Sequence, residues 1–214
     1  MDIILLDNTL PKVFKNRTNI VSDVWLNPVT FERGKFYLVE ANSGTGKSSL
    51  CSYIYGYRND YEGQILFDGE NITNFKSAQW AEIRKTQISI LWQELRLFPE
   101  LTAWENVQLK NQLTNHQTEE QIEKWFNQLG IADKKNELIG HMSYGQQQRV
   151  ALIRTLCQPA SFFFVDEPIS HLDDENSRIM KDILTNEAKK QGAGIIATSI
   201  GKRLELDYDV TFKL

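Results

Sequence analysis

Short apolar runs alternate along the chain with longer segments of helical periodicity. The apolar runs have the length and composition of β-strands, and several end in a polar residue or a turn signal. They are ILLD near the start, VTFE at 29–32, FYLVE at 36–40, GQILFD at 63–68, ISILW at 88–92, FFFVD at 162–166 and GIIAT at 194–198. Strands that alternate with helices are typical of a layered α/β domain with a largely parallel sheet. We therefore predict an α/β fold.

The pattern changes in the middle of the chain, where residues 99–140 have helical periodicity without a strand-like run. Thr118 and Gln121 have the spacing of a capping box, which predicts that a helix begins there. We interpret residues 95–158, approximately, as a helical subdomain. It is inserted into the α/β core of a single domain that spans residues 1–214.

Composition and charge narrow the function classes. The chain has 214 residues, of which 41% are hydrophobic and 24% charged, as expected for an ordinary globular protein. Its net charge of −4 leaves no wide basic field, so nucleic acid is not an expected partner. The apolar runs are far shorter than the roughly 18 residues of a membrane span, and the N-terminus has no basic region typical of a secretory signal. We therefore expect a cytoplasmic protein whose membrane link, if it has one, comes through a partner.

The segment EANSGTGKSSL at residues 40–50 lies between a strand-like run and a helical pattern, the context that distinguishes a phosphate-binding loop from an ordinary turn. Gly44 and Gly46 let the backbone curl so that successive N–H groups face a phosphate. Lys47 supplies a charge for the β- and γ-phosphates, and Ser48 offers a hydroxyl to Mg²⁺. The residues expected to contact the nucleotide are Ala41, Asn42, Ser43, Gly44, Thr45, Gly46, Lys47, Ser48 and Ser49.

This loop departs from the pattern G-x-x-x-x-G-K-[ST] at one position, because Ala41 replaces the first glycine. A methyl group is tolerated there if the residue keeps a negative φ. The competing interpretation is a Gly/Ser turn that merely precedes a helix. We favour the phosphate loop.

The segment FFFVDEP places two adjacent carboxylates, Asp166 and Glu167, at the end of an apolar strand. Successive side chains of a strand point to opposite sides, so one carboxylate can hold Mg²⁺ while the other orients a water. An acidic pair after a strand is by itself more often a solvated turn. Because the same chain carries a phosphate loop, we predict Asp166 as a metal ligand and Glu167 as the general base.

A third motif, MSYGQQQRVALIRTL, has Ser143 and Gln146 at capping-box spacing before an apolar-periodic helix. The helix start would attract an anion, although a solvated first turn is the favoured interpretation of the polar run when this motif is taken alone. Taken with the phosphate loop, Gln93 after a strand, the DE pair and SHLD at 170–173, this motif resembles the ATP-binding subunits of ABC transporters. The segment ISILWQELRLFPELTAWENV is similar to the subgroup for lipoprotein release, macrolide efflux and cell division.

The resemblance implies a P-loop NTPase core with a mostly parallel sheet, an antiparallel β subdomain and the inserted helical subdomain. In this family, ATP with Mg²⁺ lies between two subunits, which implies a homodimer or a paired ATP-binding subunit. By resemblance, Ser143, Gly145 and Gln146 contact the γ-phosphate held by the opposite subunit, and Asp173 helps to couple the two sites. Tyr144 stands where the family usually has glycine, which adds a ring beside that phosphate.

Further roles follow from the same resemblance. Gln93 is expected to contact Mg²⁺ and the attacking water, and Phe14 matches the aromatic residue on which adenine stacks. The alternative for Phe14 is a place in the core. The apolar LRLFP that follows Gln93 is expected to dock a membrane-spanning transporter subunit, which would hold the protein at the inner face of the cell membrane. Core packing is the competing role for this segment.

The strand GIIAT ends in Thr198 and Ser199, where the family usually has a histidine that contacts the γ-phosphate. A serine hydroxyl is shorter than an imidazole, so Ser199 is expected to stabilise the transition state less well. Two functions stay open. One is an ATPase that drives a membrane partner, which the presence of Glu167 favours. The other is a nucleotide-gated regulatory subunit with residual hydrolysis, which the missing imidazole favours.

Overall fold

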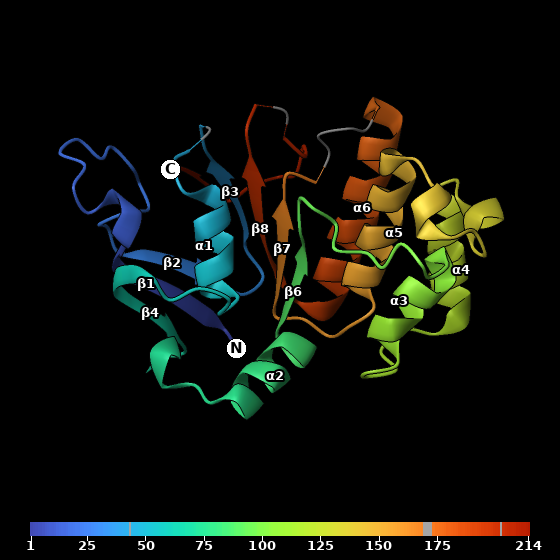
Figure 1. Cartoon of the computed structure of the whole chain (residues 1–214), viewed down its shortest axis with the longest axis horizontal. Helices are drawn as coiled ribbons and strands as arrows, with labels where there is room; N and C mark the ends of the chain where they lie inside the picture. The colour runs from blue at the N-terminus through green and yellow to red at the C-terminus, as the bar shows by residue number, and fades with distance from the viewer. Residues whose placement is uncertain (43, 169–172, 202) are drawn as a thin grey trace.

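The computed structural model describes all residues except 43, 169–172 and 202, and the described strands form two sheets (Figure 1). The antiparallel sheet has the order β2 (Val29–Glu32), β1 (Ile3–Pro11), β4 (Tyr61–Phe67), β5 (Glu70–Asn71). The other has the order β6 (Ile88–Leu91), β7 (Phe162–Asp166), β8 (Gly194–Ser199), β3 (Phe36–Glu40), β9 (Val210–Lys213), and its neighbouring strands are all parallel. The predicted combination of a parallel and an antiparallel sheet is confirmed.

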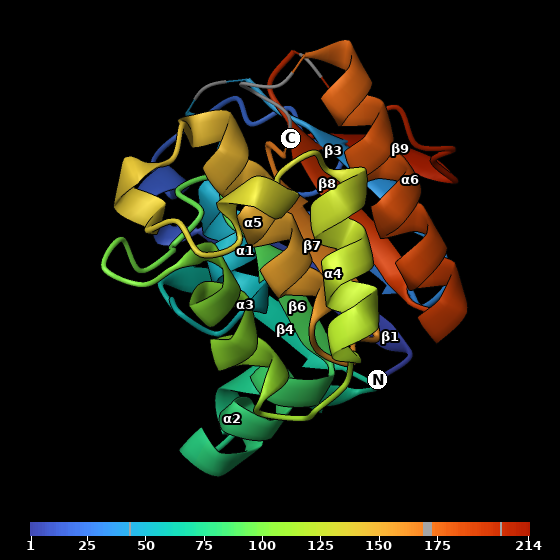
Figure 2. The same ribbon diagram turned by 90° about the vertical axis from the view of Figure 1, so that its right-hand side faces the viewer.

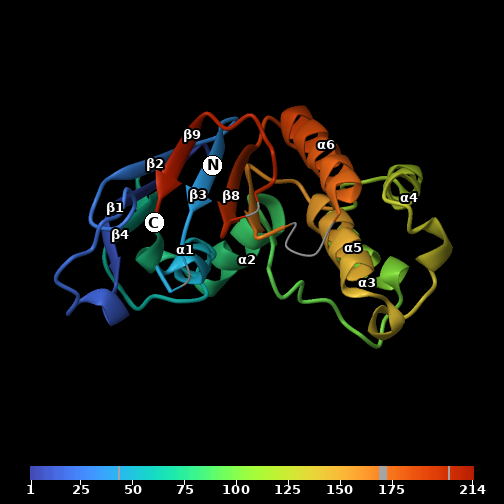
Figure 3. The same ribbon diagram turned by 90° about the horizontal axis from the view of Figure 1, so that it is seen from above.

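Helices cover both faces of the parallel sheet (Figures 1 and 3). On one side α1 lies between the two sheets, and on the other side α5 and α6 cover the parallel sheet (Figure 3). The α-helices are α1 (Lys47–Ile54), α2 (Ser77–Thr86), α3 (Ala103–Asn111), α4 (Glu119–Gln128), α5 (Tyr144–Leu156) and α6 (Asp174–Gln191). This arrangement explains why the inner strands β3, β7 and β8 are nearly continuous apolar runs, since both of their faces are covered.

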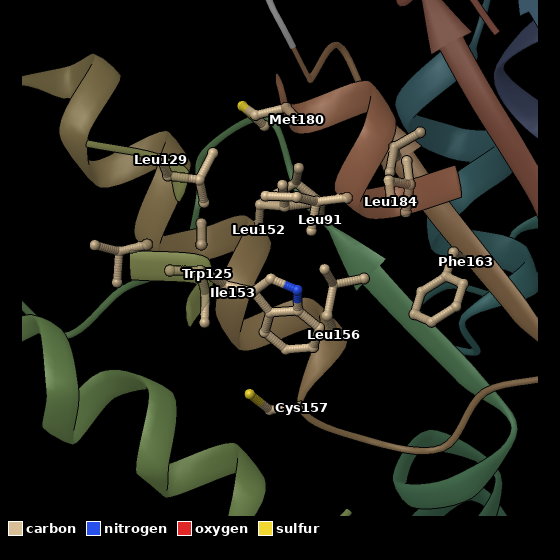
Figure 4. Packing of buried hydrophobic residues seen from close by; sticks show 14 of the residues in the cluster. Leu91, Trp125, Leu129, Leu152, Ile153, Leu156, Cys157, Phe163, Met180 and Leu184 are labelled. Atoms are coloured by element: carbon tan, nitrogen blue, oxygen red, sulfur yellow. The ribbon is translucent and has the colours of Figure 1, made fainter. Parts of the chain in front are cut away.

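Strand β7 shows how one apolar run serves two cores. Its side chains alternate, so Phe163 and Val165 pack into the core against α5 and α6, while Phe162 and Phe164 pack into the core that contains α1. All four are buried. Figure 4 shows the first of these cores, where Leu91, Leu152 and Leu184 come from β6, α5 and α6. A polar replacement anywhere in FFFV would therefore disrupt one core or the other.

Three α-helices, α3, α4 and α5, follow β6 and precede β7 in the chain, where the helical periodicity predicted them. Figure 2 shows these helices in front of the sheet. Helix α4 begins as predicted, because the Thr118 side chain accepts a hydrogen bond from the Gln121 N–H. Helix α3 begins with a reciprocal capping box between Thr102 and Glu105. Treating residues 95–158 as a separate subdomain stays a prediction.

The sequence analysis did not predict strands β5 and β9. Strand β9 is largely exposed and pairs in parallel with β3, where Phe212 is the partner of Val39, 173 residues earlier in the chain (212 − 39). Strand β5 has two residues and pairs with the end of β4. Strand β5 is too short to show a period, and the apolar alternation of VTFK in β9 spans only four residues, so neither stands out as a strand in the sequence.

Candidate functional site

The loop between β3 and α1 has the strand–loop–helix context that the sequence predicts. Gly44 and Gly46 have φ values of 79° and 101°, which L-amino acids rarely adopt, so both glycines are needed for the curl. Ala41 is not among the residues with a positive φ, which meets the condition for a methyl group at this position, and its N–H donates to the carbonyl of Ser199 at 3.0 Å. Ser43 lies outside the described residues, and phosphate contacts of the loop stay predictions.

Two aromatic side chains pack beneath this loop. The indole Nε1–H of Trp25 donates to the carbonyl of Thr45 at 2.9 Å. A Cβ added at Gly46 would lie 3.0 Å from a ring carbon of Phe14 and 3.1 Å from one of Trp25, so Gly46 is also required by close packing. Trp25 was not predicted from the sequence, because a single tryptophan carries no local signal of a contact 20 residues away.

Lys47 is clamped between the two predicted carboxylates. Its Nζ lies 2.8 Å from Asp166 Oδ1 and 2.7 Å from Glu167 Oε1, and the side chains of Lys47 and Asp166 are only 6% and 3% exposed. Burial lowers the pKa of Lys47, but the hydrogen bonds and charges of the two carboxylates outweigh burial and raise its pKa above the ordinary value. The lysine therefore keeps its charge at the base of the loop.

Asp166 is held in place from the neighbouring strand. Thr198 on β8 pairs with Asp166 on β7, and its hydroxyl donates to Asp166 Oδ1, the oxygen that also contacts Lys47. Thr198 is buried. The sequence analysis noted Thr198 at the strand end but gave it no role, because the pairing of β7 with β8 brings together residues 32 positions apart.

Glu167 follows β7 with a φ of 48°, a conformation that costs energy for a residue with a side chain. Its N–H donates to the carbonyl of Thr198 at 3.3 Å. Its Oε2 accepts a hydrogen bond from Gln93 Nε2 at 3.3 Å, while Oε1 contacts Lys47. The structure thus brings Gln93, Glu167, Asp166 and Lys47, which were each predicted as site residues, into one connected group.

The donor types in this group fit a hard cation. The Asp166 carboxylate, the amide oxygen of Gln93 and the Ser48 hydroxyl are the oxygen ligands that Mg²⁺ prefers, and Ser48 is exposed at the start of α1. Among the described residues, no group of three or more His, Cys, Asp or Glu side chains could hold a metal. A cation at this place would therefore take further oxygens from phosphate or water.

The predicted capping box at the start of α5 is confirmed. The Ser143 N–H donates to Gln146 Oε1 at 2.9 Å, and the Gln146 N–H donates to the Ser143 hydroxyl at 3.4 Å. The carbonyl of Gly145 accepts a bond from the Arg149 side chain. The Tyr144 hydroxyl donates to the carbonyl of Gln93 in its own chain at 2.6 Å, a contact that the sequence analysis did not anticipate.

Two further predicted residues have structural contacts of their own. The Asp173 side chain caps α6 by accepting a bond from the Asn176 N–H at 2.8 Å. The bonds from Asn176 lower the pKa of Asp173. Phe14 is 6% exposed in the core, with the guanidinium of Arg17 4.1 Å from its ring centroid. This packing favours the core role for Phe14, and adenine stacking stays a prediction.

Ser199 lies at the end of β8, beside Glu40 at the end of β3, and is 3% exposed. Its backbone carbonyl accepts a hydrogen bond from the N–H of Ala41 at the start of the phosphate loop. Ser199, which stands where the family usually has a histidine, therefore adjoins the predicted phosphate site. Residues 170–172 of the SHLD motif lie outside the described residues.

Comparison with known proteins shows the family. The ABC transporter family profile matches residues 27–170. The aliphatic sulfonates import ATP-binding protein of Bacillus thuringiensis subsp. konkukian is 31% identical over 86% of this chain and 70% of its own length. The lipoprotein-releasing system ATP-binding protein of Buchnera aphidicola is 27% identical over 86% and 81%.

A solved structure supports the fold. The dimeric structure of MJ0796, a bacterial ABC transporter cassette, has a TM-score of 0.76 and 23% identity over 92% of this chain and 87% of that one. Within the part of the chain that the structure describes, no helix is both long and apolar enough to cross a membrane. By its match to the family profile and to a relative of 31% identity, this chain belongs to the ABC transporter family as an ATP-binding domain.

Proposed function

We propose that this chain is the ATP-hydrolysing subunit of an ABC transporter, which couples ATP binding and hydrolysis at a dimer interface to a membrane partner. One observation carries the proposal. Lys47 of the phosphate loop, the carboxylates of Asp166 and Glu167, and the amide of Gln93 form one connected group at the ends of neighbouring strands. Ligands of open α/β sheets bind at this edge.

Each residue of the group has a separate task in hydrolysis. Lys47 would exchange a carboxylate oxygen for a phosphate oxygen, which frees Glu167 to accept a proton from water. Gln93 would orient that water through its bond to Glu167. A bound Mg²⁺ would neutralise phosphate charge, with Ser48, Asp166 and Gln93 as its candidate ligands. The Thr198 hydroxyl would keep the Asp166 carboxylate oriented during this exchange.

The proposed dimer gives the start of α5 a role in nucleotide binding. In the proposed pair, the start of α5 in one subunit, with Ser143, Gly145 and Gln146, faces the nucleotide held by the phosphate loop of the other. Asp173, at the cap of α6, would couple the two sites. Closure on ATP and reopening after hydrolysis would then move the membrane partner.

Ser199 favours a second candidate function, a nucleotide-gated regulatory subunit with weak hydrolysis. Introducing an imidazole at this strand end tests it. We expect Ser199→His to raise steady-state phosphate release about tenfold, because one donor to a developing charge is typically worth 10²–10³ in rate and the buried site accommodates a ring incompletely. ATP affinity should change little.

The control for this measurement is the same pair of proteins carrying Glu167→Gln, which subtracts contaminating phosphatase. A wild type with robust Glu167-dependent turnover that falls on introducing histidine would reject the regulatory candidate. That result would mean that the site hydrolyses ATP by a geometry that needs no imidazole.

A groove of about 270 Å³ supports the proposed membrane partner. Its lining residues include Trp92, which precedes Gln93 in the sequence. Phe98 and Leu109, which also line it, are 53% and 46% exposed. Among its described lining residues, Arg96, Lys110 and Arg154 are cationic and none is acidic, and the Arg96 guanidinium stacks on Trp92 at 3.8 Å. Its lining residues are Tyr55, Tyr57, Ser89, Ile90, Trp92, Arg96, Phe98, Asn106, Leu109, Lys110, Arg154 and Thr155.

The groove fits a partner segment with both apolar and acidic side chains. We expect Arg96→Glu to reduce co-purification of the membrane subunit about tenfold, because a like charge would then meet the acidic residue of that segment. The ATP-dependent rise in melting temperature should stay as in the wild type. Lys190→Glu, the same charge change on the exposed end of α6, serves as the control. Equal losses in both variants would contradict docking in this groove.

A further inference from the structure

Helix α5 grips the segment that carries Gln93 at three backbone carbonyls. At its start, the Tyr144 hydroxyl donates to the carbonyl of Gln93 at 2.6 Å. Near its end, the Arg154 guanidinium donates to the carbonyls of Leu95 at 2.6 Å and Arg96 at 2.7 Å. One rigid helix therefore fixes the position of the whole turn.

The turn needs such support. Leu95 and Arg96 have φ values of 59° and 51°, which are unfavourable for residues with side chains and persist only where surrounding contacts impose them. Internal bonds run from the N–H of Leu95 to the carbonyl of Trp92 and from the N–H of Arg96 to the carbonyl of Glu94. The hydrogen bonds from Tyr144 and Arg154 of α5 add to these internal bonds and hold the turn that follows β6 in this conformation.

Of the two α5 side chains, Tyr144 makes the contact nearest to the predicted general base, Glu167. It bonds the peptide carbonyl of Gln93, the residue whose side chain reaches Glu167 across 3.3 Å. A hydrogen bond of that length is near its geometric limit, so a small rotation of the Gln93 backbone would break it. Burial and the nearby carboxylates of Glu94 and Glu167 raise the pKa of Tyr144, which keeps its hydroxyl protonated and able to donate.

We propose that Tyr144 is a positioning residue, whose hydroxyl sets the backbone of Gln93 and thereby aims the Gln93 amide at Glu167. This inference rests on the proposed function, because it assigns Gln93 to the orientation of water beside Glu167. It also gives α5 a direct effect on the site of its own chain. A shift at the start of α5 moves the carbonyl of Gln93 through a single hydrogen bond.

The test removes the hydroxyl and keeps the ring. We expect Tyr144→Phe to lower kcat for phosphate release about fivefold to tenfold with KM for ATP within a factor of two, since one neutral hydrogen bond is lost. Hydrogen exchange of segment 92–98 should become faster. Tyr208→Phe is the matched control, because the Tyr208 hydroxyl also donates to a backbone carbonyl, that of Leu204 at 2.7 Å.

A double-mutant cycle separates positioning from a general structural role. In a Gln93→Ala background the amide that Tyr144 aims is gone, so Tyr144→Phe should leave kcat unchanged there. The same fractional loss in both backgrounds, or unchanged exchange of segment 92–98, would overturn the proposal. If the wild type releases no Glu167-dependent phosphate, the proposed function fails, and the exchange rates still decide whether Tyr144 holds the turn.

Discussion

Replacing Lys47 with alanine is expected to abolish the rise in melting temperature that Mg²⁺ and ATP give the wild-type protein. Lys47 is the buried cation at the base of the phosphate loop. Without it, Asp166 and Glu167 would face the phosphates unneutralised, so binding should be lost. At ATP concentrations about 100 times Kd, the wild type should gain about 2.7 kcal/mol, a shift of roughly 5–10 °C for a chain of this size.

Each protein in this thermal measurement is compared with its own sample without ATP, since removing one member of a buried charge group also destabilises the fold by about 3–5 kcal/mol. Lys134→Ala, which removes a lysine from a short surface helix, provides the control and should keep the full shift. A Lys47→Ala protein that folds and still shows the wild-type shift would reject the phosphate-loop assignment.

Replacing Glu167 with glutamine should lower phosphate release by about 10²-fold or more, because a general base typically contributes 10²–10⁴. The glutamine keeps the size of the side chain and its hydrogen bond with Gln93, while it removes the carboxylate that accepts the proton. ATP should therefore bind and stay uncleaved. We expect the protein to accumulate as a dimer that size-exclusion chromatography detects only when ATP and Mg²⁺ are present.

Glu82→Gln, at an exposed position of α2, is the matched control and should hydrolyse ATP at the wild-type rate. Two results would count against the proposed composite site. One is a Glu167→Gln protein that stays monomeric at saturating ATP, and the other is unchanged phosphate release. The first would remove the reason for a second anion-attracting helix end at Ser143, and the second would remove Glu167 from the reaction.

Local sequence signals succeeded where the physical cause is itself local. Gly44 and Gly46 indicated a tightly curled loop, because only glycine adopts positive φ values at little cost. Both residues have positive φ values in the structure. Ser143 with Gln146 marked the start of α5 because a capping box involves residues three apart. The run FFFV marked a strand buried on both faces, since only such a strand alternates between two cores without a polar side.

The tertiary structure decided everything that depends on pairing between distant segments. The clamp of Lys47 between Asp166 and Glu167 spans 119 positions, and the bond from Tyr144 to Gln93 spans 51. No periodicity or turn signal encodes such distances. The sequence by itself determined the glycine-rich loop after β3, the carboxylate pair after β7 and the capping box of α5, because residue type and short spacing fix these features; the phosphate-binding and acid–base roles of these residues stay predictions. Which of them touch was decided by the order of strands in the parallel sheet and by the packing of α5 against the turn after β6.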